Sequence, residues 1–260
     1  MQILFTCDTE LSCGLFQRGT SLEDNLAQSI FGRTAGGEHG IAYQMRRLSA
    51  HGHRGVFFVD PMPACIYGLD AVRPIVSAVC EAGHEVQLHL HPEWLAFADH
   101  GPMAGIRRTS IKDFTLAQQV ELLARAADWL VACGAPYPTA FRAGNYGAND
   151  DTLRALATLG IGFDSSFNPA YAGSDSLIEL PTTQVLATHR HGVVELPISC
   201  IEDGAAGVRH AQICALSVRE MREAIDWAVE RGQPHFVVVS HSFELVSRDR
   251  KRPARTAVTR

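Results

Sequence analysis

Two histidines, His89 and His91, end a short apolar segment and are the residues of this chain best suited to bind a metal ion. Val86 and Leu88 indicate a buried strand, and Pro92 ends it. Side chains alternate along a strand, so both imidazoles point to one side with Cβ atoms about 6–7 Å apart. That spacing allows them to share one ion. The alternative, two polar residues on a solvated strand end, fits the apolar neighbours less well.

Three further segments carry reactive side chains at places where strands are expected to end. Asp8 and Glu10 follow the first apolar run, Arg142 ends the fourth, and His241 ends the last. A carboxylate with two imidazoles forms a metal site that leaves positions open for water and substrate. We expect Glu10 to be the carboxylate ligand and Asp8 the general base, although the reverse assignment is open. Arg142 would then orient the base, and His241 would serve as general acid.

These residues depend on an alternation of strands and helices along the chain. The predicted strands span residues 3–7, 55–59, 85–89, 139–142, 160–164, 193–196 and 235–240. The predicted helices span residues 41–50, 71–82, 116–133, 150–159 and 218–231. This order predicts an α/β fold with a mostly parallel sheet, closed or nearly closed, in which reactive groups gather at the carboxyl ends of the strands.

Local signals support these boundaries. Thr115 with Gln118 and Ser217 with Glu220 have the spacing of capping boxes, and Asn149 is placed as a helix N-cap. Residues 11–38 are expected to form a long loop, and residues 171–192 an inserted hairpin.

Composition limits the class of protein. The chain has 260 residues, a net charge of −5 and 46% hydrophobic residues, so we expect one domain over residues 1–260 and no nucleic-acid partner. Seven scattered cysteines without a C-x-x-C pair are typical of a reducing compartment. No leader segment and no membrane-spanning run is evident in the sequence. The expected location is the cytoplasm.

These motifs resemble, in their order and in their residues, those of the polysaccharide deacetylase family, carbohydrate esterase family four. The similar segments are residues 6–10, 55–60, 83–92, 142–147 and 240–242. The resemblance spans residues 3 to about 245 and implies a distorted (β/α) barrel of about seven strands. It also implies hydrolysis of N- or O-acetyl groups with a bound divalent metal, often zinc. The expected substrate is an acetylated amino sugar, a saccharide intermediate or a small amide.

Departures from the family pattern leave two other functions open. The family usually has two adjacent aspartates in its first motif, whereas Thr9 follows Asp8 here and Glu10 is the next carboxylate. The family's metal-binding histidines are usually four apart, whereas His89 and His91 are two apart. A non-catalytic glycan-binding barrel is one alternative, and a metal-independent cyclic amide hydrolase on the same fold is the other.

Further roles are expected around the site. Trp94, Tyr146 and Phe243 are candidates to stack on a sugar ring. Asp164 is expected to orient His241 as an outer carboxylate. A backbone N–H of Tyr146 or Gly147 would bind the oxyanion. By contrast, His84 is expected to be a hydrogen-bonded structural residue.

The end of the chain lacks the apolar stripe of a covering helix. A barrel of this type normally closes with a helix after its last strand, but residues 248–260 are basic and contain Pro253. We therefore expect either a shortened chain or a homo-oligomer in which a partner subunit covers this seam.

Overall fold

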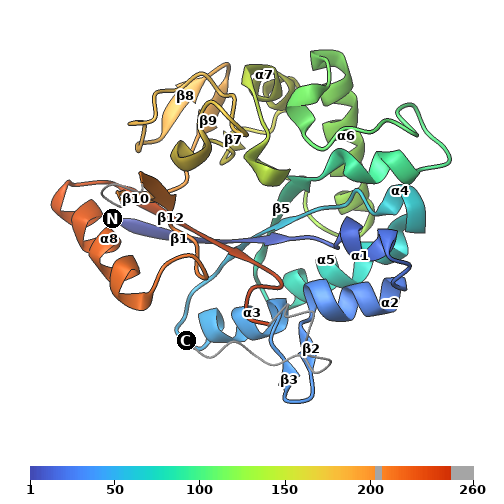
Figure 1. The fold of residues 1–260 in the computed structure, drawn as a ribbon, viewed down its shortest axis with the longest axis horizontal. Helices are drawn as coiled ribbons and strands as arrows, with labels where there is room; N and C mark the ends of the chain where they lie inside the picture. Colours follow the sequence, from blue (N-terminus) through green and yellow to red (C-terminus); the bar gives the residue numbers. More distant parts are fainter. Residues whose placement is uncertain (203–206, 247–260) are drawn as a thin grey trace.

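The computed structural model describes residues 1–202 and 207–246, and its centre is a curled eight-stranded sheet (Figure 1). The strands run in the order β12, β1, β4, β5, β6, β7, β9, β8, and only β8 is antiparallel to its neighbour. Their bounds are β12 His235–His241, β1 Gln2–Thr9, β4 Val56–Val59, β5 Glu85–Leu90, β6 Ala140–Ala143, β7 Phe163–Asp164, β9 Val193–Glu195 and β8 Thr188–Arg190. All seven predicted strands are present, and the predicted parallel arrangement is confirmed.

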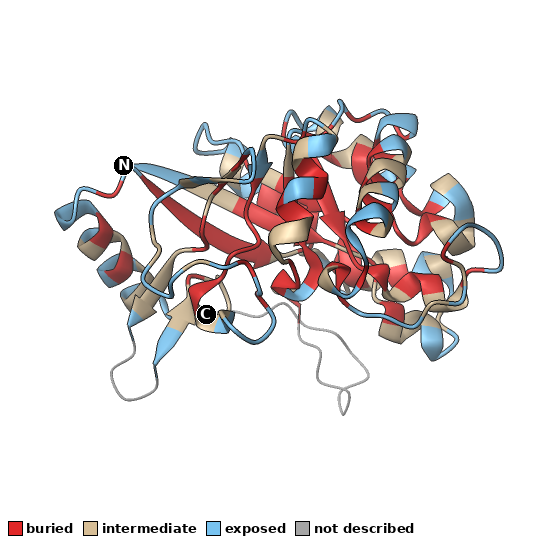
Figure 2. Cartoon of the chain, turned by 90° about the horizontal axis from the view of Figure 1, so that it is seen from above, coloured by how far each residue is buried: buried red, intermediate tan, exposed pale blue. Residues whose placement is uncertain are grey.

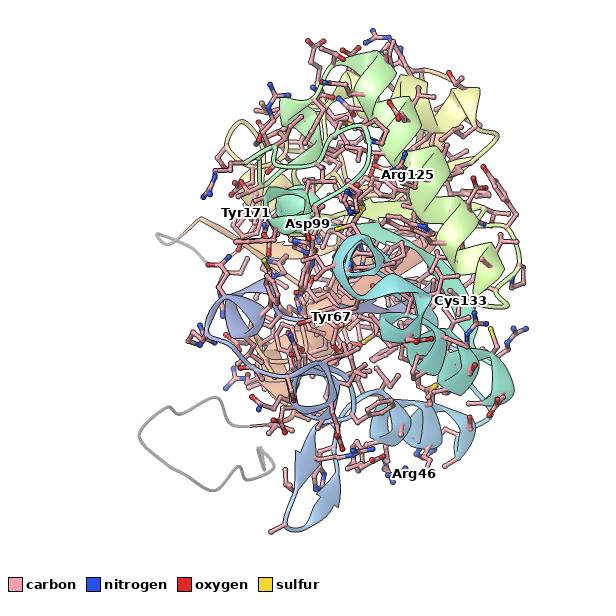
Figure 3. All side chains as sticks on the ribbon, turned by 90° about the vertical axis from the view of Figure 1, so that its right-hand side faces the viewer. Arg46, Tyr67, Asp99, Arg125, Cys133 and Tyr171 are labelled. Atoms are coloured by element: carbon pink, nitrogen blue, oxygen red, sulfur yellow. The ribbon has the colours of Figure 1, made fainter. Side chains whose placement is uncertain are left out.

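The five predicted helices are also confirmed. They are α3 (Ile41–Ser49), α5 (Arg73–Glu81), α6 (Leu116–Ala132), α7 (Asp150–Thr158) and α8 (Val218–Glu230). Thr115 and Ser217 both close the capping boxes expected from sequence, and Asn149 forms a third with Thr152. Figure 3 shows α5 and α6 covering one side of the molecule, with Arg46 of α3 pointing outward.

The strands of the sheet are largely apolar because both faces of the sheet are covered. Phe57, Leu88 and Phe141 on three adjacent strands have no exposed surface. Figure 2 shows the sheet buried and the exposed residues gathered on the outer faces of the helices. A parallel sheet packed on both sides needs continuous apolar segments rather than alternation, which is the pattern in the sequence.

The prediction of a long loop over residues 11–38 was wrong. Ser12 and Ser21 each accept a hydrogen bond from a backbone N–H and begin short helices. The buried Asn25 side chain bonds both backbone polar groups of Ser12, which holds these helices together. The segment contains α1 Cys13–Gln17, α2 Leu22–Asn25, a π-helix Leu26–Ile30 and the hairpin of β2 Arg33–Thr34 and β3 Gly37–Glu38.

The inserted hairpin was expected within residues 171–192, but it lies later in the chain. It consists of β8 and β9 and ends at Glu195. A second hairpin that the sequence did not suggest consists of β10 (Cys200–Glu202) and β11 (Val208–His210). The remaining elements are α4 Ala64–Tyr67 and the 3₁₀ turns Gly68–Ala71, Pro92–Phe97, Ile111–Asp113, Gly144–Tyr146 and Pro169–Tyr171.

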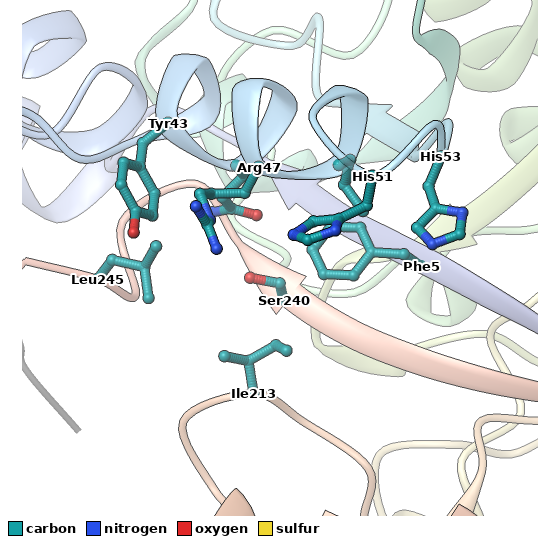
Figure 4. Close-up of a pocket in the computed structure, with 10 residues that line it drawn as sticks. Phe5, Tyr43, Arg47, His51, His53, Ile213, Ser240 and Leu245 are labelled. Atoms are coloured by element: carbon teal, nitrogen blue, oxygen red, sulfur yellow. The ribbon is translucent and has the colours of Figure 1, made fainter.

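A groove of about 280 Å³ lies at the β1–β12 seam, where the covering helix was expected to be missing. Figure 4 shows α3 on one side of it and Ile213 and Leu245 on the other, with Phe5 of β1 at its floor. Among residues 1–202 and 207–246, no helix follows β12. The basic segment 248–260 lies outside the described residues, and cover by a partner subunit remains a prediction.

No helix of the described chain is long and apolar enough to cross a membrane.

Candidate metal and acid–base site

A polar cavity of about 260 Å³ opens where β1, β5, β6 and β12 end. It lies at the carboxyl ends of these parallel strands, as the fold rule predicts. The cavity is lined by Asp8, Glu10, His89, His91, Asn145, Tyr146, Tyr171, Asp175, His210, Gln212 and His241. Six sequence candidates, from four separate segments, therefore meet around one space, and Arg142 lies behind it.

Glu10, His89 and His91 bring three donor atoms within 4.8 Å of one another. The Glu10 Oε2 atom lies 3.3 Å from His89 Nε2 and 2.5 Å from His91 Nε2. Neither of these close contacts is a hydrogen bond to this oxygen. Ligands of one tetrahedral zinc ion lie about 3.3 Å apart, so the donor set and the His89 contact fit such an ion.

His89 is held with its Nε2 atom free to bind a metal. Its Nδ1 lies 2.7 Å from the carbonyl oxygen of Arg142, so the ring donates this proton and leaves the Nε2 lone pair facing Glu10. A hydrogen bond on the second ring nitrogen is the usual way in which metal-binding histidines are oriented. The His91 ring packs on Gly144, where an added Cβ would approach it to 2.6 Å.

The charges of the cluster are strongly linked. Burial alone would raise the pKa of Glu10, but His91 and His89 hold it well below its usual value. Burial would lower the pKa of His91, and Glu10 instead raises it to about 10. In the metal-free chain, Glu10 and His91 therefore form an ion pair. The proton on His91 supplies the positive charge that a bound metal ion would supply instead.

Asp8 and Arg142 form a buried pair, as expected if Arg142 orients the base. The Arg142 Nη1 atom donates to Asp8 Oδ1 at 2.7 Å and to Thr6 Oγ1 at 2.8 Å. The contact with Asp8 is made by one guanidinium nitrogen only, because Nε and Nη2 of Arg142 donate to Ser165. Burial raises the pKa of Asp8, but Arg142, His89 and His241 together hold it below its usual value.

His241 is oriented by Glu244, so the prediction of Asp164 for this role was wrong. Glu244 Oε1 lies 3.0 Å from His241 Nδ1, and the Gln212 amide donates to the same carboxylate. Burial lowers the pKa of His241, but Glu244 and Asp8 raise it above its usual value overall. Asp164 instead accepts hydrogen bonds from the hydroxyl and the N–H of Ser166.

Only one of the three expected sugar-stacking residues lies on the cavity. Trp94 has no exposed surface and packs against Phe16 and Tyr67, so the structure contradicts a stacking role. Phe243 stacks on His241 with ring centroids 5.2 Å apart and is absent from the cavity wall. Tyr146 does line the cavity.

Tyr146 belongs to an aromatic wall that the sequence did not reveal. It stacks on Tyr171 with centroids 5.7 Å apart, and His210 packs against both rings. Tyr171 ends the 3₁₀ turn Pro169–Tyr171, and His210 ends β11 of the second hairpin, two elements that the sequence did not clearly indicate.

His84 and Asp60 are two further buried polar residues of the sheet region. His84 accepts the N–H of Gly55 at Nδ1 and contacts Ser49 at Nε2, as expected of a structural histidine. Asp60 follows the second predicted strand, and nothing in the sequence indicated that it lies close to the cluster. It is buried, receives the His91 N–H, and burial raises its pKa to about 6.

No protein-family model and no curated protein matches this sequence. Among solved structures, a presumed polysaccharide deacetylase from Mycobacterium smegmatis has a TM-score of 0.61 at 17% identity, over 93% of this chain and 77% of that chain. A family 4 carbohydrate esterase from Streptomyces lividans in complex with acetate has a TM-score of 0.37 at 15% identity, over 65% and 64% of the two chains. The polysaccharide deacetylase of Bacillus cereus has a TM-score of 0.43 at 11% identity, over 94% and 80%. The first of these similarities confirms the fold that the motifs implied.

Proposed function

We propose that this chain, whose fold is that of the polysaccharide deacetylases, is a metal-dependent hydrolase that removes an acetyl group from an acetylated amino sugar or saccharide intermediate. One observation carries the proposal. A possible metal cluster, a carboxylate paired with a buried arginine, and a histidine paired with a glutamate line or adjoin the same cavity. These are the three groups needed to activate water, accept its proton and protonate a leaving amine.

Glu10, His89 and His91 would hold the metal, for which zinc fits the mixed carboxylate and imidazole donors best. When bound, such an ion polarises a carbonyl group and lowers the pKa of water to about 7. The chain's own contribution is orientation, since the Arg142 carbonyl fixes the His89 ring and Gly144 leaves room for the His91 ring.

Asp8 would act as the general base. Its Oδ1 atom is held by Arg142, which keeps the carboxylate ionised and fixes its direction. The remaining oxygen, Oδ2, has no hydrogen bond to any described residue and is available to accept a proton from water in the cavity. Glu10 is less suited to this role, because both histidines already contact it.

His241 would protonate the leaving amine. The Glu244 contact at Nδ1 leaves Nε2 as the atom available to the cavity. Glu244 and Asp8 raise the pKa of His241 above its usual value, which favours the protonated ring that an acid catalyst requires. For the oxyanion, the Gly147 N–H is already bonded to the Gly144 carbonyl, which favours the Tyr146 N–H.

The aromatic wall supports a sugar as substrate. Tyr146, Tyr171 and His210 offer ring faces beside the reactive groups, and sugar rings commonly pack on such faces. The free cysteines are typical of a reducing compartment, which supports a cytoplasmic saccharide intermediate or small amide rather than an extracellular polymer.

Acetate release from acetylated saccharides tests the proposal directly. The zinc-loaded protein is expected to release acetate from di-N-acetylchitobiose, and removal of the metal with a chelator is expected to abolish turnover. Turnover that survives chelation would instead favour the metal-independent cyclic amide hydrolase. Saccharide binding without turnover, in protein shown to contain metal, would favour the glycan-binding barrel.

A further inference from the structure

The turn that follows β6 has an unusual backbone. Asn145 has φ 53° and ψ 21°, and Tyr146 has φ 57°, so two successive residues with side chains adopt the left-handed conformation. Within residues 1–202 and 207–246, His191 is the only other non-glycine residue with positive φ. Such conformations cost on the order of 1–3 kcal/mol each and persist where the surroundings enforce them.

Contacts on both sides explain why the turn keeps this shape. Gly144 packs against the His91 ring, and Tyr146 is buried among Ile198, Val237 and Val239. The turn is therefore fixed at one end by a candidate metal ligand and at the other by the barrel interior. Asn145 lies between these two anchors.

Asn145 presents an uncommitted amide to the cavity. Its side chain is exposed, lines the same cavity as Glu10 and His91, and makes no hydrogen bond within the part of the chain that the structure describes. The other side-chain amide on the wall, Gln212, is engaged with Glu244 and His241. Asn145 is thus the side-chain amide of the wall that can both donate and accept a hydrogen bond without breaking one.

A structural explanation of Asn145 must be weighed against a ligand-binding one. Asparagine tolerates the left-handed region better than most residues, which could by itself explain its presence. Glycine would adopt this conformation with no steric cost, so a position that served only the turn would accept glycine without loss. The two explanations therefore differ in what they predict for a single substitution.

We infer that Asn145 is a substrate-binding residue whose side-chain amide hydrogen-bonds a hydroxyl group of a neutral sugar, beside the acetylamino group to be cleaved. A hydroxyl offers one donor and an acceptor, which matches the amide, and the turn aims the amide at the cavity. The inference rests on the proposed function for its choice of a sugar as ligand.

The test compares Asn145→Gly with the wild-type chain, both zinc-loaded, using di-N-acetylchitobiose as the probe. Binding is measured by calorimetry, turnover by acetate release, and stability by thermal unfolding. Asn145→Gly is expected to raise Kd and KM about 3- to 10-fold, the effect of one lost hydrogen bond, while Tm stays unchanged or rises. Asn149→Gly is the matched control, because it removes the hydrogen bonds of the Asn149 side chain with Thr152, Gln119 and Lys112 and should lower Tm with Kd unchanged.

Each outcome decides the inference. An unchanged Kd and KM in Asn145→Gly would show that the residue serves only the turn. If the wild-type chain binds the probe without releasing acetate, the deacetylase proposal fails, and the binding comparison still decides the role of Asn145. If the wild-type chain binds neither this probe nor N-acetylglucosamine, the inference is overturned.

Discussion

At the scale of single residues, the two carboxylates of the first motif have different surroundings. Asp8 contacts a guanidinium and keeps one oxygen free, whereas Glu10 contacts two imidazoles. A carboxylate between two histidines is a ligand by its chemistry, and a carboxylate held ionised by arginine is a base. This difference supports the proposal that Glu10 is the metal ligand and Asp8 the general base.

Asp8→Asn is predicted to lower turnover by about 10²- to 10⁴-fold, because the amide cannot accept a proton. The metal content should stay close to one ion per chain, since the three donor atoms are untouched. Glu10→Gln is the comparison, and it should lose metal and activity together. Equal metal loss in both variants would show that Asp8 is itself a ligand.

Replacement of either histidine tests the cluster without reference to activity. His89→Ala and His91→Ala are each predicted to reduce bound zinc at least tenfold, measured by elemental analysis after dialysis. His84→Ala is the control, because His84 bonds Gly55 and Ser49 and contributes no donor atom to the cluster. Metal content that does not change in the two cluster variants would place the ion elsewhere.

The sequence was sufficient to identify residues whose role follows from their place at a strand end. Asp8, Glu10, His89 and His91 lie together because parallel strands end at one edge of the sheet. It was not sufficient for Glu244, which reaches His241 through the turn after β12, or for Trp94, whose ring turns into the core. Side-chain direction in irregular segments depends on tertiary packing, which no local pattern encodes.

At the scale of elements, the turn after β6 connects residues 142–147 to the candidate metal cluster, because Gly144 packs on the His91 ring. Gly144→Ala is predicted to displace the His91 ring, because the new Cβ would lie 2.6 Å from it. Zinc content should fall together with turnover. Gly162→Ala is the matched control, since a Cβ at that position meets nothing within 4 Å. Similar zinc content in both variants would show that the His91 ring can move without cost.

The first residue of α7 gives a prediction for pH. Asp150 accepts hydrogen bonds from Arg190, His191 and the Glu179 N–H, which outweigh its burial and lower its pKa from 3.8 to about 2. A lowered pKa stabilises the folded chain above about pH 4, and this stability is lost as the pH falls toward 2. Asp150→Asn should therefore lower the free energy of unfolding by on the order of 1 kcal/mol at pH 7, allowing for solvent screening.

Thermal unfolding at several pH values measures this effect. The difference in Tm between the wild-type chain and Asp150→Asn should shrink as the pH approaches 2. Asp151→Asn should change Tm little at any pH, because Asp151 pairs with Arg154 on the open surface. A difference for Asp150→Asn that does not vary with pH would exclude the ionised carboxylate as its cause.

Elements with strong periodicity could be predicted from sequence, and short ones could not. The helix α6 combines a capping box with an apolar stripe, and its predicted bounds differ from the observed ones by one residue. In residues 11–38 the helices are only four or five residues long. They are stabilised by serine caps and by the buried Asn25, contacts that have no hydrophobic period.

At the scale of the whole molecule, the candidate metal site exists only in the folded chain. Glu10 follows β1, and His89 and His91 come from β5 and its end, with β4 between these strands in the sheet. The donor atoms meet only when all three strands are paired, so a metal ion held by them would bind the folded state far better than the unfolded one. Binding energy at this site therefore adds to the free energy of unfolding.

We predict that zinc at 100 times its Kd stabilises the fold by about 2.7 kcal/mol, which for a chain of this size raises Tm by about 5–10 °C. The unfolded chain exposes 12 histidines and 7 cysteines that also bind zinc, which makes the measured shift smaller than this limit. His91→Ala keeps all seven cysteines and eleven of the twelve histidines, so it corrects for that binding. The difference in Tm shift between the wild-type chain and His91→Ala, measured by calorimetry with and without zinc, thus reports on the folded site alone. Equal shifts in the two proteins would mean that zinc does not bind at the end of β5, and the proposed metal-dependent reaction would lose its basis.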